Sequence, residues 1–211
     1  MKFIYYYFLL IFEKKTMKTL LFESDRYYHV YNRGNNKETI FETEANYFYF
    51  LKLLKKYIIP VATIYSYCLL PNHFHLILKI KDTNALPENI KSGKRGIHQP
   101  FSNLFNAYAK AYNKMYNRTG SLFQKNVKRI EITDEVYLRN LIVYVNTNSS
   151  HHGIADFTVY KHSSYNAIIS DKPTLLQRND LLDLFDGVVN FIYMHKLKKD
   201  MIGVNNRLAF D

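Results

Sequence analysis

The sequence predicts an α+β fold, in which an antiparallel β-sheet is packed on one face by helices and is followed by a C-terminal helical extension. Two features of the chain lead to this prediction. Short segments of β-forming residues alternate with amphipathic helical segments, in the order β-α-β-β-α-β-α. The second and third strands are joined only by a Leu-Pro-Asn turn, so we expect them to form an antiparallel hairpin.

The first half of the chain is predicted to supply a strand, a helix and this hairpin. Residues 27–33 are rich in β-forming residues and end at a Gly-Asn-Asn turn, which indicates a strand. Residues 43–58 carry apolar residues at helical spacing and stop before Pro60, which indicates an amphipathic helix. Residues 61–70 and 73–80 are the expected strands of the hairpin.

The second half begins with a polar, basic stretch over residues 81–99, which predicts a flexible loop. A helix is expected over residues 101–117. Gly120 follows shortly after it and is a typical residue at the end of a helix. Residues 121–132 are expected to be extended. Asp134 is suited to cap a helix over residues 135–148.

The chain has 211 residues, the size of one domain with an extension at each end. Residues 1–16 are interpreted as an N-terminal apolar extension, either an over-extended translation start or a loosely held strand. Residues 17–170 are expected to form the main domain. Residues 171–211 are expected to form a C-terminal helical tail, with a last amphipathic helix over 179–199.

The apolar run at residues 3–12 bears on the cellular location. It is too short for a membrane-spanning helix, which needs about 20 residues. It is followed by Glu-Lys-Lys-Thr, which lacks the small residues of a signal-peptide cleavage site. An anchor lying at the membrane surface is the alternative interpretation. We expect a cytoplasmic protein with no stable membrane association.

The charge balance predicts a polyanionic partner. Lys and Arg number 29 against 18 Asp and Glu, a net charge of +11, which favours nucleic acid or an anionic membrane. The 19 Tyr and 15 Phe suit single-stranded nucleic acid, because bases stack on aromatic rings. The one cysteine, Cys68, excludes a disulfide framework and a multi-cysteine zinc site.

Seven cations are candidates for contacts with phosphate. They lie in the basic stretch over 81–99, in the expected extended segment over 121–132, and in the helix after it. They are Lys91, Lys94, Arg95, Lys125, Lys128, Arg129 and Arg139. The alternative is that these charges form a solvated face that only keeps the protein in solution.

The His73-Phe74-His75 segment lies in a predicted strand. Side chains alternate along a strand, so the two imidazoles point to one face while Phe74 points to the core. Two imidazoles about 7 Å apart on one face can share a divalent ion. Two exposed strand histidines without a ligand are the alternative.

Tyr144 and Asn148 are four residues apart in a predicted helix and therefore stand on the same side of it. The Asn148 carboxamide oxygen is suited to be a third ligand of the ion held by the histidines. A buried core tyrosine and an ordinary helix end are the alternative. Together with the histidines, this pair suggests metal-assisted attack by a tyrosine on a phosphodiester.

Several segments resemble the REP-associated tyrosine transposases, which belong to the insertion-sequence transposases with a His-hydrophobe-His motif and one catalytic tyrosine. The similarity is carried by residues 28–37, by Leu-Leu-Pro-Asn-His-Phe-His-Leu at 69–76 and by Gly-Ser-Leu-Phe-Gln at 120–124. Residues 144–153 match the family's Tyr-Ile-x-x-Asn-Pro-x-x-x-Gly element, and Ser-Ser-Tyr follows at 163–165. Ser149 stands where the family usually has proline, which loosens the turn but removes no reacting group.

This resemblance implies a ferredoxin-like antiparallel sheet and a possible homodimer. It also implies a DNA transposase that cuts and rejoins single-stranded DNA beside a hairpin without ATP. Tyr144 would form a 5′-phosphotyrosine intermediate, with Mg²⁺ or Mn²⁺ held by His73, His75 and Asn148. The alternative is a protein of the same fold that binds a DNA or RNA hairpin without cutting it.

Overall fold

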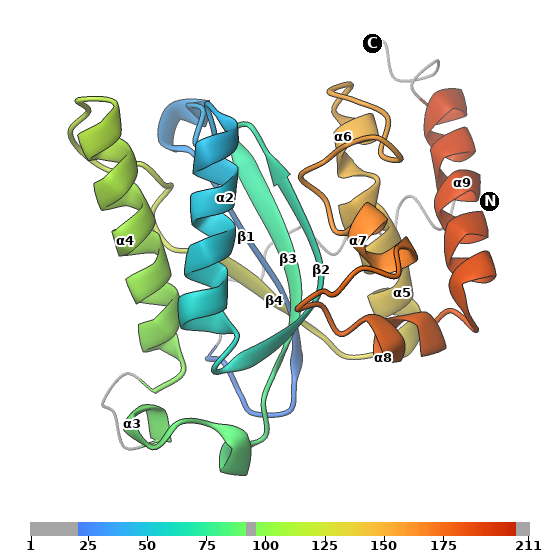
Figure 1. The fold of residues 1–211 in the computed structure, drawn as a ribbon, viewed down its shortest axis with the longest axis horizontal. Coiled ribbons are helices and arrows are strands. Elements are labelled where there is room, and N and C mark those ends of the chain that lie inside the picture. Colours follow the sequence, from blue (N-terminus) through green and yellow to red (C-terminus); the bar gives the residue numbers. More distant parts are fainter. Residues whose placement is uncertain (1–20, 92–95, 206–211) are drawn as a thin grey trace.

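A computed structural model describes residues 21–91 and 96–205 of the chain (Figure 1). Its centre is a sheet of four strands, all paired antiparallel, in the order β2-β3-β1-β4. The strands are β1 (Tyr27–Arg33), β2 (Ala62–Leu70), β3 (His73–Ile80) and β4 (Lys128–Ile132). Helix α2 (Glu44–Leu53) joins β1 to β2, and α4 (His98–Met115) joins β3 to β4. This β-α-β-β-α-β order is ferredoxin-like, and the α+β class is confirmed.

The helices α2 and α4 cover one face of the sheet, as predicted (Figure 1). Phe50 of α2 and Leu104 of α4 are fully buried against Val30 and Phe74 of the sheet. The predicted helix over 43–58 is α2 followed by a π-helical turn, η2 (Leu54–Ile58).

Helices also cover the second face, which the prediction of helices on one face did not include (Figure 1). These helices are α5 (Glu135–Asn146), α6 (Asn148–His151), α7 (Tyr165–Ile169), α8 (Arg178–Asp183) and α9 (Val188–Asn205). The reason lies in the strands, since Cys68 of β2 and Ile77 of β3 are apolar and point to this face. Such strands need cover on both sides.

The predicted last helix over 179–199 is in fact two helices, α8 and α9. The chain turns between them, where Asp186 and Gly187 have φ angles of 54° and 106°. These left-handed conformations cannot continue an α-helix. Leu181 of α8 and Phe191 of α9 are fully buried in the same apolar cluster as residues of α5. The expected domain boundary at residue 170 stays a prediction.

The described part of the predicted loop over 81–99 contains helical turns, and its last two residues already belong to α4. It contains the short helices η3 (Thr83–Ala85) and α3 (Glu88–Lys91). The expected extension over 1–16 lies outside the described residues. In the part of the chain that the structure describes, no helix is both long enough and apolar enough to cross a membrane.

Gly34 follows β1 beside the turn that precedes β3, just before the short helix η1 (Asn35–Lys37). Its amide donates to the carbonyl oxygen of Asn72 at 2.8 Å. A methyl group on Gly34 would overlap the carbonyl oxygen of Glu38, which is part of the backbone and cannot swing away.

We therefore expect Gly34→Ala to lower the free energy of unfolding by about 3 kcal/mol. Gly153→Ala is the matched control, because that glycine has open space around it and only a left-handed backbone, at φ 63°. It should cost about 1 kcal/mol. Urea unfolding of both variants measures the difference, and equal losses would contradict the predicted overlap.

Candidate active site

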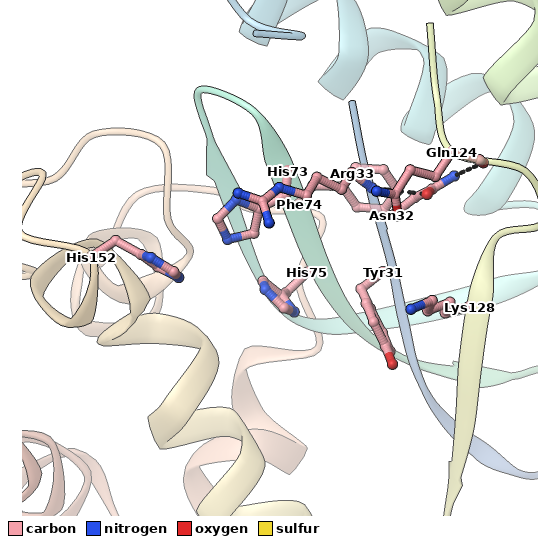
Figure 2. Close-up of a pocket in the computed structure, with 9 residues that line it drawn as sticks. All are labelled: Tyr31, Asn32, Arg33, His73, Phe74, His75, Gln124, Lys128 and His152. Carbon is pink, nitrogen blue, oxygen red and sulfur yellow. Dashed lines mark hydrogen bonds between the residues drawn. The ribbon is translucent and has the colours of Figure 1, made fainter. Parts of the chain in front are cut away.

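The His-Phe-His segment lies at the start of β3, as predicted. Phe74 is buried in the core between the sheet and the helices α2 and α4. His73 and His75 point to the opposite face, where α5 packs. Their ring centroids are 5.3 Å apart with an angle of 87° between the planes, so the two imidazoles border a common space (Figure 2).

Each of these two imidazoles uses its Nδ1 atom in a hydrogen bond within the protein. Nδ1 of His73 donates to the amide oxygen of Asn72 at 2.7 Å. Nδ1 of His75 is hydrogen-bonded to Nε2 of His29, a buried residue of β1, at 2.9 Å. In both rings Nε2 is therefore the nitrogen left for a ligand, the arrangement that orients histidines in metal sites.

Burial keeps these rings neutral. Loss of solvent lowers the pKa of His73 to about 4 and the pKa of His29 to about 3. It also lowers the pKa of His75 well below its usual value, and the neighbouring imidazoles act in the same direction. Neutral imidazole is the form that binds a metal ion.

Tyr144 and Asn148 approach the two histidines from α5 and α6, although neither is among the residues that line the cavity described below. The Tyr144 ring, on α5, is 6.0 Å from the His75 ring between centroids. Helix α5 ends at Asn146, and Asn148 begins α6 after a one-residue break at Thr147. The structure thus brings the predicted tyrosine close to the His75 ring.

The Asn148 side chain is the least satisfied polar group of the site. It is fully buried, yet neither its amide nitrogen nor its amide oxygen has a hydrogen-bond partner of normal geometry. Its amide lies beside His73, where it acts to raise the pKa of that ring against the larger effect of burial. A buried amide left without a partner costs free energy, about 1–3 kcal/mol, which a ligand would recover.

A second tyrosine, which the sequence did not single out, also lies at this site. Tyr31 of β1 is stacked on His29 and His75, with its ring centroid 5.7 Å from that of His75. Its hydroxyl points away from His73 and Arg33 (Figure 2). Burial raises the pKa of the Tyr31 phenol, which makes it harder to ionise.

A cavity of about 370 Å³ opens at the histidines and is lined by the nine residues labelled in Figure 2. Arg33 and His152 are among the lining residues that were not predicted to act here. Arg33, at the end of β1, has a buried Nε without a hydrogen-bond partner. His152 lies after α6, and its ring centroid is 4.8 Å from that of His73. A cavity with an arginine and neutral imidazoles suits a phosphate group.

The donor set at the histidines fits a divalent metal ion. Among the described residues, no three His, Cys, Asp or Glu side chains form a metal-binding cluster. The candidate ligands are instead two imidazoles and the unpaired amide of Asn148. These three ligands are neutral, so they leave the charge of an ion free to act on phosphate.

The predicted phosphate-binding cations lie in different places. Lys128 lines the cavity and stands 5.9 Å from the centre of the Tyr31 ring. Lys125 and Arg129 line a neighbouring groove of about 910 Å³ along α4, which shares Asn32 and Gln124 with the cavity.

The other predicted cations do not border either space, or lie beyond what the structure describes. Lys91 pairs with Glu88 at 3.6 Å, and Arg139 pairs with Glu135 at 3.7 Å. Lys94 and Arg95 fall outside the described residues. Contacts of these four with DNA stay predictions.

Comparison with known proteins shows the fold. No family model and no curated protein matches the chain. Five chains among the solved structures match. One of them is a REP-associated tyrosine transposase bound to a REP hairpin, with a TM-score of 0.54 and 15% sequence identity. The match covers 75% of this chain and 89% of the other, so the two chains share a fold.

Proposed function

We propose that this chain is a DNA transposase, a metal-dependent single-strand endonuclease and strand transferase that recognises a DNA hairpin. The observation that carries the proposal is that Tyr144 and the buried Asn148 amide lie beside two imidazoles whose Nδ1 atoms are held by hydrogen bonds within the protein. The shared fold with a transposase whose structure contains a hairpin supports the choice of DNA hairpin as partner.

The proposed reaction exchanges one ester bond for another. Oη of Tyr144 forms a bond to phosphorus, the bond between phosphorus and the 3′-oxygen breaks, and the phenolic proton ends on that oxygen. His73, His75 and Asn148 would hold Mg²⁺ or Mn²⁺, which when bound offsets phosphate charge and stabilises the leaving oxygen. The 5′-phosphotyrosine keeps the energy of the broken ester, so a second 3′-hydroxyl rejoins the strand without ATP.

Residues around the cavity would hold the DNA strand. Arg33 and Lys128 border the cavity and are suited to bind the phosphates next to the scissile bond. Lys125 and Arg129 extend the positive charge into the adjoining groove, which suits the continuing strand. A homodimer on hairpin DNA stays a prediction.

Binding to single-stranded DNA is expected to weaken steeply with salt. With about five phosphates contacted, the logarithm of the affinity should fall against the logarithm of salt with a slope of about −3.5. Lys128→Ala removes one cation from the cavity and should bring the slope closer to zero by about 0.7. Fluorescence anisotropy between 50 and about 300 mM salt measures both slopes.

Lys52→Ala is the matched control for charge, because Lys52 is exposed on α2 and lines neither the cavity nor the neighbouring groove. It should leave the slope unchanged. If Lys128→Ala behaves like this control, Lys128 does not contact phosphate.

Covalent trapping separates the transposase from a hairpin-binding protein that does not cut. The protein is incubated with Mn²⁺ and labelled single-stranded hairpin DNA from the flanks of its gene, and adducts stable in SDS are sought. The proposal predicts an adduct that EDTA prevents. Tight hairpin binding without any adduct would favour the binding protein, and preference for a matched RNA hairpin would favour an RNA ligand.

A further inference from the structure

A buried network of polar side chains lies behind the proposed active site. Asn146 is at its centre, and its Oδ1 accepts from the Ser164 hydroxyl at 2.6 Å. The Ser66 hydroxyl of β2 lies 3.1 Å from the same oxygen and 3.0 Å from that of Ser164. On the other side, the amide nitrogen of Asn146 is 3.1 Å from Nε2 of His195. All four side chains are fully buried.

The chemistry of His195 fixes the direction of these hydrogen bonds. Its Nδ1 is 2.7 Å from the carbonyl oxygen of Phe191, which only accepts, so Nδ1 carries the proton. Nε2 then accepts from the Asn146 amide nitrogen, which in turn directs Oδ1 of Asn146 toward the two serines. Burial among aromatic rings lowers the pKa of His195 to about 4, so the ring is neutral at pH 7.

In the sequence, Asn146 lies between the two proposed site residues Tyr144 and Asn148. Asn146 is the last residue of α5, two residues after Tyr144 and two before Asn148. Because a helix turns about 100° per residue, Asn146 stands on the side opposite to both of them. Its hydrogen bonds therefore hold the segment from the side opposite to the one that carries the proposed nucleophile and the proposed third ligand.

The segment needs such an anchor because its helix is interrupted. Thr147 has φ −88° and ψ 3°, outside regular α-helical geometry, and separates α5 from the one-turn helix α6. A misplacement of reacting groups by 1 Å is enough to slow an enzyme about 100-fold. The serines tie the segment to β2, beside the strand of His73 and His75, and His195 ties it to α9.

We propose that His195 and Asn146 are positioning residues, through which helix α9 holds Tyr144 and Asn148 in register with the histidines of β3. The inference rests on the proposed function and extends it, since it makes the C-terminal helix part of the catalytic apparatus without any contact with DNA.

The test compares two substitutions of His195. Glutamine presents an amide oxygen that is suited to accept from Asn146 in place of Nε2, whereas leucine fills the space and leaves the Asn146 amide unpaired. At saturating Mn²⁺ and hairpin DNA, we expect His195→Leu to slow adduct formation at least tenfold and His195→Gln to stay within about threefold of the wild type. The dissociation constant for the hairpin should change less than twofold.

The Leu181→Ala variant distinguishes a general loss of stability from a loss of positioning at the site. Leu181 is fully buried in α8 within the same apolar cluster, so its loss destabilises the fold without touching the network. Measured below the melting temperature of every variant, this control should keep the saturating rate. If His195→Leu also keeps it, or if His195→Gln is as slow as His195→Leu, the inference is overturned.

If the proposed function itself is wrong, the result is different, because the wild-type chain then forms no adduct at all. Hydrogen exchange of the backbone amides at residues 144–152 then decides whether the network holds this segment. Faster exchange in His195→Leu than in His195→Gln and Leu181→Ala supports the anchor, and equal exchange in all three excludes it.

Discussion

Replacing Tyr144 by phenylalanine is expected to abolish the covalent adduct with hairpin DNA while leaving hairpin binding intact. The substitution removes one oxygen atom, the one that we propose attacks phosphorus, and keeps the ring beside His75. Removal of an enzyme's nucleophile costs about 10³-fold or more in rate. Because Tyr144 is only half-buried, stability should change by no more than about 0.5 kcal/mol.

Tyr137→Phe is the matched control for this substitution. Tyr137 stands two turns earlier on the same side of α5 and is also half-buried, but it does not border the histidines. Its variant should form the adduct at the wild-type rate. An adduct that persists in Tyr144→Phe would show that another residue attacks, and Tyr31 would then be the first to examine.

Asn148→Leu is expected to have opposite effects on stability and on activity. Without metal, the Asn148 amide is buried and has no hydrogen-bond partner of normal geometry, so replacing it by an apolar side chain of similar size should raise the free energy of unfolding by about 1 kcal/mol. The same change removes the proposed third ligand. We therefore expect it to abolish the Mn²⁺-dependent adduct.

Thermal unfolding with and without Mn²⁺ measures this trade-off. Wild-type protein at a Mn²⁺ concentration 100 times its dissociation constant should gain about 2.7 kcal/mol, and Asn148→Leu and His73→Ala should gain little. Asn140→Leu, an exposed change on α5, is the control and should respond to Mn²⁺ like the wild type. An Asn148→Leu variant that retains the full Mn²⁺ response would exclude Asn148 as a ligand.

The strands and main helices could be predicted because local patterns determine them. The Leu-Pro-Asn turn specifies the hairpin of β2 and β3, and alternation along β3 places His73 and His75 on one face. Tyr144 and Asn148 both lie beside these histidines, as their spacing predicts, even though α5 ends between them. Here local structure and the resemblance lead to the same residues.

The residues that were missed depend on contacts between distant segments. His29, Tyr31 and Arg33 alternate on one face of β1, but only the pairing of β1 with β3 brings them beside His73 and His75. The positioning role that we propose for His195 depends on the packing of α9 against α5, which no local pattern encodes. The helices on the second face were missed because their position depends on how the chain after β4 folds back over the sheet, which no local pattern encodes.

The central claim is that Tyr144 is the residue joined to DNA, and peptide mapping of the trapped adduct tests it most directly. Trypsin places Tyr144 in the peptide spanning 140–161 and the rival Tyr31 in the peptide spanning 27–33. Mass spectrometry after nuclease digestion should find the added nucleotide on the first peptide, with fragment ions assigning it to Tyr144 rather than Tyr160. A nucleotide on Tyr31, or on any residue other than Tyr144, would contradict the account.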